Sequence, residues 1–283
     1  MNSAVWKIAL RTLARDKTYA LLNVAGLAIA VACCLILGIY LRSELTYDQH
    51  HVNHERIFRV VNEFDINGKV DRFAVTSPAL APMLVDDNAD IQAYVRFLTL
   101  GTQRFIQRGD IGAYWTDFYV TDPNIFDVFT HEIVYGDPKG ALDAPGSIAI
   151  SRRMAEYYFG DENPVGQTLA FDGVEGTITL VFENLPDNTH LKYDILGSSN
   201  IAMFNLPPDI SQRRQRLFGV GWYTYVVLPE NYDPADWQEL SSTFFERHMS
   251  TIGDQIKEKW RSWIQPHDQI HYNSNFSYDL PTS

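Results

Sequence analysis

The chain has 283 residues, with 35 Asp and Glu against 23 Lys and Arg, so its formal net charge is -12. Hydrophobic residues make up 46% of the chain and aromatic residues 13%, which is enough apolar material for a packed core and excludes a disordered protein. The acidic balance also argues against a nucleic-acid partner, because phosphate binding needs a basic surface.

Residues 19–41 form an uncharged apolar run in which Asn23 is the only strongly polar residue. A helix of this length extends about 34 Å, which is enough to cross a hydrocarbon core of about 30 Å. We therefore predict a transmembrane helix over 19–41. A cleaved signal peptide fits less well because its apolar region is only about 7–15 residues long. A lipoprotein signal ending at Cys33 would leave an apolar tail, because the run continues to Leu41.

The charges that flank this span set its orientation. Before it lie Lys7, Arg11, Arg15, Asp16 and Lys17, and after it lie Arg42, Glu44, Asp48 and Glu55. The positive-inside rule then places the N-terminus in the cytoplasm and residues 42–283 outside. The first 41 residues carry +3, which leaves -15 for the exported part.

Within residues 1–18, Lys7, Arg11 and Arg15 recur every four positions, and apolar residues fall on another side. This pattern predicts an amphipathic elbow lying on membrane lipid at the cytoplasmic surface. The alternative is that these charges only fix the topology. The only cysteines, Cys33 and Cys34, lie in the span, so a packed core and not a disulfide framework must hold the exported part together.

Strand-like and helix-like segments alternate along the exported part. Composition and alternation predict strands at 57–64, 93–100, 115–121, 167–171, 177–183 and 222–228, with an extended segment at 270–280. Turn and capping residues predict a hairpin at Asn67-Gly68, a helix from Ser77 and Pro78 to about Asp86, a helix at 151–159 ending before Gly160, and a helix at 236–249. Strand–helix–strand occurs near 57–121 and again near 222–280, with a mixed insertion between them. We therefore predict an α+β fold with two subdomains.

Motifs for enzymatic chemistry are absent from the sequence. It contains no GxxxxGK[ST] phosphate loop, no GxSxG elbow, no HExxH zinc helix and no GxGxxG turn. We therefore predict that the chain is not an enzyme and has no catalytic residue and no cofactor.

The best metal candidate is the run His50-His51-x-x-His54-Glu55. On a helix, His50 and His54, or His51 and Glu55, would share a face and could hold zinc. The favoured interpretation is a solvated, histidine-rich helix near the membrane, so no metal site is predicted.

Several segments, in order along the chain, resemble a known family. They are 8–13, 43–48, His51, Asn53, 56–60, 122–129, 158–169 and 184–190. Together they resemble the first transmembrane helix and periplasmic core domain of the MacB/FtsX-like ABC-transporter permeases. The resemblance implies a porter-like periplasmic subdomain over 42–122 and 218–283, interrupted by a smaller α/β subdomain at 123–217.

This resemblance implies a function and partners. The chain would be a permease subunit, or its N-terminal part, in a bacterial inner membrane. It would form a homodimer or paired permease and would transmit motion from a separate cytoplasmic ABC ATPase to the periplasmic domain. That motion would serve efflux, lipoprotein extraction or related export, with a periplasmic adaptor or cargo protein as a further partner. The resemblance carries no catalytic residues.

Two other hypotheses remain open at this point. The family pattern continues after residue 280 into three more transmembrane helices, whereas this sequence stops at Ser283. Either the sequence is part of a longer permease or it is a short form. A short form would be a single-pass anchored periplasmic binding or adaptor module without direct ATPase coupling. An anchored hydrolase is the third hypothesis, and only the histidine run supports it.

Overall fold

The computed structural model describes residues 15, 17–66, 68–101, 103–201, 204–251, 258–272 and 276–280. Contacts divide the chain into two compact units, Met1–Tyr47 and Asp48–Ser283. Most of the predicted elbow, residues 1–14 and 16, lies outside the described residues.

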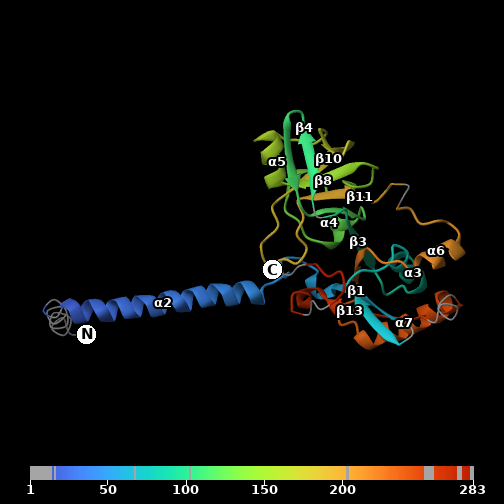
Figure 1. Cartoon of the computed structure of the whole chain (residues 1–283), viewed down its shortest axis with the longest axis horizontal. Coiled ribbons are helices and arrows are strands. Elements are labelled where there is room, and N and C mark those ends of the chain that lie inside the picture. Colours follow the sequence, from blue (N-terminus) through green and yellow to red (C-terminus); the bar gives the residue numbers. More distant parts are fainter. Residues whose placement is uncertain are drawn as a thin grey trace. The chain divides into compact units, whose positions relative to one another are not determined.

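The first unit contains one long helix, α2 (Lys17–Leu45), drawn in blue in Figure 1. None of its residues is buried, although apolar side chains cover it on every side. An apolar helix of 29 residues is long enough to cross a membrane, and a soluble helix would show a polar face. The structure therefore confirms the predicted helix as an apolar helix long enough to span a membrane, and α2 extends it by a few residues at each end.

The second unit is built on hydrogen-bonded strands (Figure 1), in the order β13-β1-β12-β3-β6-β11-β8-β10-β9-β4-β5, with β2 paired to β1 and β7 paired to β10. The strands are β1 (Ile57–Ile66), β2 (Lys69–Phe73), β3 (Ala93–Thr99), β4 (Arg104–Arg108), β5 (Ile111–Trp115), β6 (Phe118–Thr121), β7 (Ile133–Gly136), β8 (Ser147–Ser151), β9 (Thr168–Phe171), β10 (Val174–Phe182), β11 (Ile195–Ser198), β12 (Tyr223–Val227) and β13 (Glu258–Pro266). The helices are α3 (Leu80–Asp87), α4 (Ile125–Val128), α5 (Arg152–Phe159), α6 (Ile210–Arg216) and α7 (Pro234–His248), with 3-10 turns η1 (His54–Arg56) and η2 (His267–Gln269). A mixed sheet with helices, preceded by one apolar helix, confirms the α+β class.

The sheet is mixed because two of its strand pairs are parallel. β8 pairs parallel with β10, and β6 pairs parallel with β11, whereas the other neighbours on this path are antiparallel. β6 and β11 are adjacent in the sheet, and the segment between them contributes β7, β8, β9 and β10 to the same sheet. The boundaries of the two predicted subdomains, at 123 and 217, stay a prediction.

Capping residues explain where two of the helices begin and end. The Ser151 hydroxyl accepts a hydrogen bond from the Met154 amide at the start of α5, and Gly160 ends this helix at a φ of 64°. The Asp233 side chain caps α7, whose first residue is Pro234. The sequence predicted both helices to within two residues.

The structure corrects two local predictions. Ser77 and Pro78 form a turn that precedes α3, so Pro78 is not the first residue of that helix. The strand predicted at 115–121 is broken, because Asp117 adopts a φ of 60°, which interrupts the extended backbone between β5 and β6.

The last predicted strand is also in the wrong place. We expected an extended segment at 270–280, but the long final strand is β13, which pairs antiparallel with β1 from Phe58↔Pro266 to Ile66↔Glu258. Charged residues interrupt the apolar pattern of β13, so its strand state depends on pairing with β1 and not on local composition.

The interior contains three groups of buried apolar side chains. The central group surrounds Phe97, whose ring makes edge contacts with Phe129 and Tyr225. A second group packs α7 against the sheet through the fully buried Trp237 and Phe244. A third group holds α5 against β8 and β10 (Figure 1). These groups fix the strands that carry the polar residues described next.

Candidate functional site

The first residue of the second unit, Asp48, is fully buried and carries several hydrogen bonds. Its backbone φ is 60°, a conformation that Asp tolerates better than most residues, and its amide donates to the Asn188 carbonyl at 2.9 Å. Oδ1 accepts from the Thr189 hydroxyl at 2.8 Å and from the His190 amide at 3.0 Å, while Oδ2 lies 2.8 Å from Nδ1 of His190. The loop between β10 and β11 therefore encloses this carboxylate.

His190 extends the contacts of Asp48 into the sheet. Its Nε2 lies 2.8 Å from the hydroxyl of Tyr225, a fully buried residue of β12. Burial raises the pKa of Tyr225 well above its usual value, so the phenol stays protonated. Asp48, His190 and Tyr225 thus form a continuous buried chain of hydrogen bonds.

A second imidazole, that of His267 in η2, packs against the first. The rings of His190 and His267 meet edge to face with centroids 4.8 Å apart, and Nε2 of His267 lies 3.9 Å from Oδ1 of Asp48. His267 is fully buried, and neither of its ring nitrogens has a hydrogen-bond partner among the described residues.

Two further histidines complete the cluster of rings. The centroids of His50 and His51 lie 3.8 Å apart, and His51 packs edge-on against Phe129. Nδ1 of His51 accepts a hydrogen bond from the Thr130 amide at 3.1 Å. Both ring nitrogens of His50 are buried and, within the described part of the chain, have no hydrogen-bond partner.

Burial decides the charges in this cluster. It lowers the pKa values of His50, His51 and His267, so these rings are neutral near pH 7. Burial alone would raise the pKa of Asp48, but the hydrogen bond and charge of His190, with smaller contributions from His267 and Thr189, lower it overall. The site therefore holds an ionised carboxylate near the neutral rings of His50, His51 and His267.

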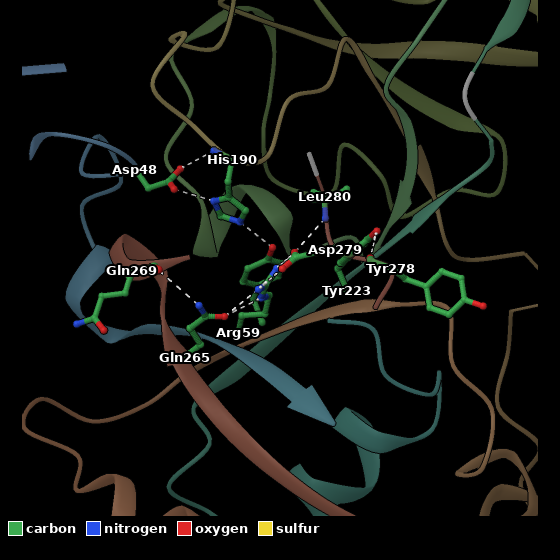
Figure 2. Close-up of polar contacts among 10 residues, drawn as sticks. Asp48, Arg59, His190, Tyr223, Gln265, Gln269, Tyr278, Asp279 and Leu280 are labelled. Atoms are coloured by element: carbon green, nitrogen blue, oxygen red, sulfur yellow. Dashed lines mark hydrogen bonds and ion pairs between the residues drawn. The ribbon is translucent and has the colours of Figure 1, made fainter. Parts of the chain in front are cut away.

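A second buried contact joins β1 to the last described segment of the chain, residues 276–280. Arg59 is fully buried, and its Nη2 donates to Gln265 Oε1 at 2.8 Å and to Asp279 Oδ2 at 3.1 Å. Figure 2 shows Arg59 between Gln265 and Asp279, with Asp48 and His190 nearby. The guanidinium is thus paired and hydrogen-bonded, as a buried charge must be.

The two sets of contacts meet in the sheet, because Arg59 of β1 is the register partner of Tyr225 of β12. We call the whole set the buried polar network, which consists of Asp48, Arg59, His190, Tyr225, Gln265 and Asp279. It links the residue that follows the α2 unit to the segment at 276–280 through the first three strands on the sheet path, β13, β1 and β12.

The chemistry of this network is structural. An Asp–His pair can activate a nucleophile, but here the second ring nitrogen of His190 faces a buried phenol. Asp48, Tyr225 and His267 are fully buried, so a substrate has no access to them. The arrangement holds distant segments of the chain together.

The structure corrects the geometry expected for the histidine run. Residues 46–53 form turns and a bend, and His54 lies in a 3-10 turn, so the expected helix that would align His50 with His54 is absent. Nδ1 of His54 lies 3.1 Å from the carbonyl of His51 and does not join the other rings. The expected solvated face is also wrong for His51, which is 2% exposed.

Sequence reasoning missed the residues that complete the cluster. Asp48 and His190 lie within the segments that resemble the family, but nothing in their local pattern indicates that they touch. His267 follows the missed strand β13 and carried no signal of its own. Only the paired strands bring these three positions together.

Comparison with known proteins supports a family assignment. The model of a family described as the MacB-like periplasmic core domain matches residues 20–241. A domain of a protein assigned as a permease in Porphyromonas gingivalis is similar in fold, with a TM-score of 0.64, 20% identity and coverage of 76% of this chain and 91% of that one.

Two further solved structures match more distantly. The periplasmic region of MacB from Actinobacillus actinomycetemcomitans has a TM-score of 0.45, 13% identity and coverage of 77% of this chain and 94% of that one. The extracellular domain of the noncanonic ABC-type transporter YknZ from Gram-positive bacteria has a TM-score of 0.45, 14% identity and coverage of 72% and 99%. A search of curated proteins gives no match.

Proposed function

Because the chain belongs to the family of MacB-like periplasmic core domains, we propose that it is a permease subunit, or the N-terminal part of one, in an ABC transporter. In this role it transmits motion from a separate cytoplasmic ATPase to the exported domain, for efflux, lipoprotein extraction or related export. The observation that carries the proposal is the succession of a membrane-spanning helix and a family-matched domain within one chain.

The buried polar network supports transmission of motion. Asp48 follows the end of α2 by three residues, and its carboxylate is held by three hydrogen bonds within the second unit. A displacement of the span would reach Asp48 first and then Tyr225 in β12 through His190. Because this chain of contacts is buried, its hydrogen bonds resist displacement better than exposed ones.

We further propose that the N-terminus is cytoplasmic and that residues 42–283 face the periplasm of an inner membrane. The basic residues before the span and the acidic residues after it support this orientation. Replacing Cys33 and Cys34 with Ala leaves a chain without thiols, into which single cysteines can be introduced. In intact cells, a membrane-impermeant maleimide should label Asp110→Cys on the exposed β4–β5 turn but not Ser3→Cys. Labelling of Ser3→Cys alone would reverse the topology.

The proposed partners are a cytoplasmic ABC ATPase, a second permease copy or a paired permease, and membrane lipid, with an adaptor or cargo protein outside. The test is affinity purification of the natural gene product from its own membranes in mild detergent, followed by mass spectrometry. A nucleotide-binding subunit should co-purify. Recovery of the folded protein without such a subunit would contradict ATPase coupling and favour an anchored adaptor.

The two-subdomain arrangement is part of this proposal. Residues 42–122 and 218–283 would form the porter-like subdomain, and 123–217 the insertion. β6 is the last strand before residue 123 and β12 the first strand after residue 217, and both pair with β3. This supports the boundaries, because an inserted segment must leave and re-enter its host at neighbouring points.

A further inference from the structure

We propose that Asp48, His190 and His267 form a binding site for a zinc ion. One donor atom from each residue lies within 4.8 Å of the others, and all three residues are buried. Zinc binds carboxylate oxygen and imidazole nitrogen at about 2.0–2.2 Å, so a small inward movement of these side chains brings the three donors into range. Three protein ligands leave the fourth position of a tetrahedral zinc ion open.

His267 is the observation that points to a ligand. Its ring is fully buried, and its two nitrogens have no hydrogen-bond partner in the described ranges of the chain. A buried polar group without a partner is costly, so native proteins rarely retain one without a reason. A metal ion facing Nε2, which already lies 3.9 Å from Oδ1 of Asp48, gives this nitrogen a partner.

His190 can bind the ion without losing its place in the sheet. In a neutral ring, Nδ1 carries the proton that faces Oδ2 of Asp48, and Nε2 accepts from the Tyr225 hydroxyl. When Nδ1 binds zinc, the single proton of the ring lies on Nε2 and is donated to the Tyr225 oxygen. Tyr225 then acts as the outer partner that fixes the orientation of the ligand.

The charges of the cluster match the needs of the ion. Zinc binds neutral imidazole, and burial lowers the pKa of His267 well below its usual value, which keeps this ring neutral near pH 7. The absence of thiolates and the mixture of nitrogen and oxygen donors suit zinc better than magnesium or calcium, which prefer oxygen alone. A fourth neutral imidazole, His50, interacts electrostatically with all three ligands.

The site would join three distant parts of the chain. Asp48 follows the α2 unit, His190 lies between β10 and β11, and His267 follows β13. A zinc ion would therefore fix the entry of the exported domain to two other segments and stiffen it.

The test uses the full chain in detergent, stripped of metal by dialysis against a chelator. Titration with zinc chloride should give one bound ion per chain and raise the melting temperature, because an ion that binds only the folded state stabilises it. Cobalt chloride should give the intense visible absorption of a tetrahedral site.

The key variant is His267→Leu. Its metal-free melting temperature should equal or exceed that of the parent, because the change removes an unpartnered polar group and retains the volume. Zinc should no longer raise its melting temperature, and the cobalt absorption should disappear. The matched control is His54→Gln, which lies outside the cluster and should bind both metals as the parent does.

Two results would overturn the proposal. One is a folded, metal-free parent chain that binds no zinc. The other is a His267→Leu variant that binds zinc as tightly as the parent, which would place any bound ion elsewhere. Loss of binding in His54→Gln would contradict the assignment in the same way, because His54 is not one of the ligands.

Discussion

Asp48 and His190, 142 residues apart in the sequence, are joined by a hydrogen bond of 2.8 Å between two fully buried side chains. The contact ties the residue that follows the α2 unit to the loop before β11. A buried carboxylate is stable only when its oxygens are occupied, and here both oxygens of Asp48 accept hydrogen bonds. This pair is therefore the point at which the second unit fixes its own N-terminal end.

Replacing Asp48 with Asn should destabilise the exported domain. The amide group keeps one acceptor oxygen but places an N–H donor where the second oxygen was, so it faces either the Thr189 hydroxyl and His190 amide or Nδ1 of His190 with a donor. We expect a loss of about 2–4 kcal/mol in the free energy of unfolding, because a buried charged hydrogen-bond network loses its acceptor. Urea unfolding of the full chain in detergent, followed by tryptophan fluorescence, measures this loss. Asp110→Asn on an exposed turn is the control, and equal stability of the two variants would contradict the prediction.

Sequence alone predicts those parts of the fold whose causes are local. The apolar run of α2 needs no partner to be recognised, and the caps of α5 and α7 act within one turn of the chain. By contrast, β13 carries charged residues in its apolar pattern, and its strand state comes from pairing with β1. Asp117 breaks a predicted strand through a backbone conformation that composition does not encode.

The candidate site was harder to predict for the same reason. The histidine run drew attention to His50 and His54 because four-residue spacing aligns side chains on a helix. The chain instead turns there, and the partners Thr130 and His267 of His51 are more than 70 positions away. Spacing within one segment does not reveal contacts that depend on the register of a whole sheet.

Gly136 at the end of β7 should tolerate no side chain. Its φ is 95°, and a Cβ atom built there would lie 2.4 Å from the Thr179 carbonyl oxygen on the neighbouring strand β10. We expect Gly136→Ala to cost about 3 kcal/mol or more, since both backbone strain and a steric clash oppose it.

Gly68 provides the matched control because its φ is 85° but its Cβ would meet nothing within 4 Å. Gly68→Ala should cost only the backbone strain, about 1–2 kcal/mol. Thermal unfolding of the two variants under the same conditions separates strain from clash. Equal losses of stability in Gly136→Ala and Gly68→Ala would show that β7 and β10 lie farther apart at Gly136 than in the structure.

His131 should make the stability of the domain depend on pH. Its Nε2 lies 2.7 Å from the Tyr193 hydroxyl and its Nδ1 lies 2.8 Å from the Phe129 carbonyl. Burial, opposed by the hydrogen bond to Phe129, lowers the pKa of His131 from 6.5 to about 4. The unfolded chain therefore binds a proton at higher pH than the folded chain does. The contribution of neutral His131 to the free energy of unfolding is complete above pH 6.5. It is lost as the pH falls toward 4, and the loss is about 3 kcal/mol at most.

Urea unfolding at several pH values between 4 and 7 tests this expectation. The buried histidines of the Asp48 cluster contribute in the same direction. The free energy of unfolding of the parent should therefore change more steeply with pH than one titrating group explains. His131→Gln, which can still bond to Tyr193, should show a smaller slope than the parent. An unchanged slope would show that His131 is protonated to the same extent in the folded and unfolded chains.

Breaking the pair between Arg59 and Asp279 should be the most damaging single change to the buried polar network. Asp279→Ala leaves the guanidinium of Arg59 fully buried, with Gln265 as a neutral partner. We expect a loss of about 3–5 kcal/mol, because an uncompensated charge remains in the interior. Limited proteolysis should at the same time release the segment at 276–280, since the Asp279 carboxylate bonds this segment to Arg59 of β1.

The matched control is Asp71→Ala on β2, whose carboxylate forms an exposed pair with Lys69 at 3.1 Å. Loss of an exposed ion pair costs at most about 1 kcal/mol, because solvent screens both charges. Asp279→Asn separates the effect of the charge from that of the hydrogen bonds, since it keeps one acceptor oxygen for Arg59. Its loss in the free energy of unfolding should lie between those of Asp279→Ala and Asp71→Ala. If all three variants unfold at the same urea concentration, Asp279 does not hold the last described segment to the sheet, and the buried polar network ends at Gln265.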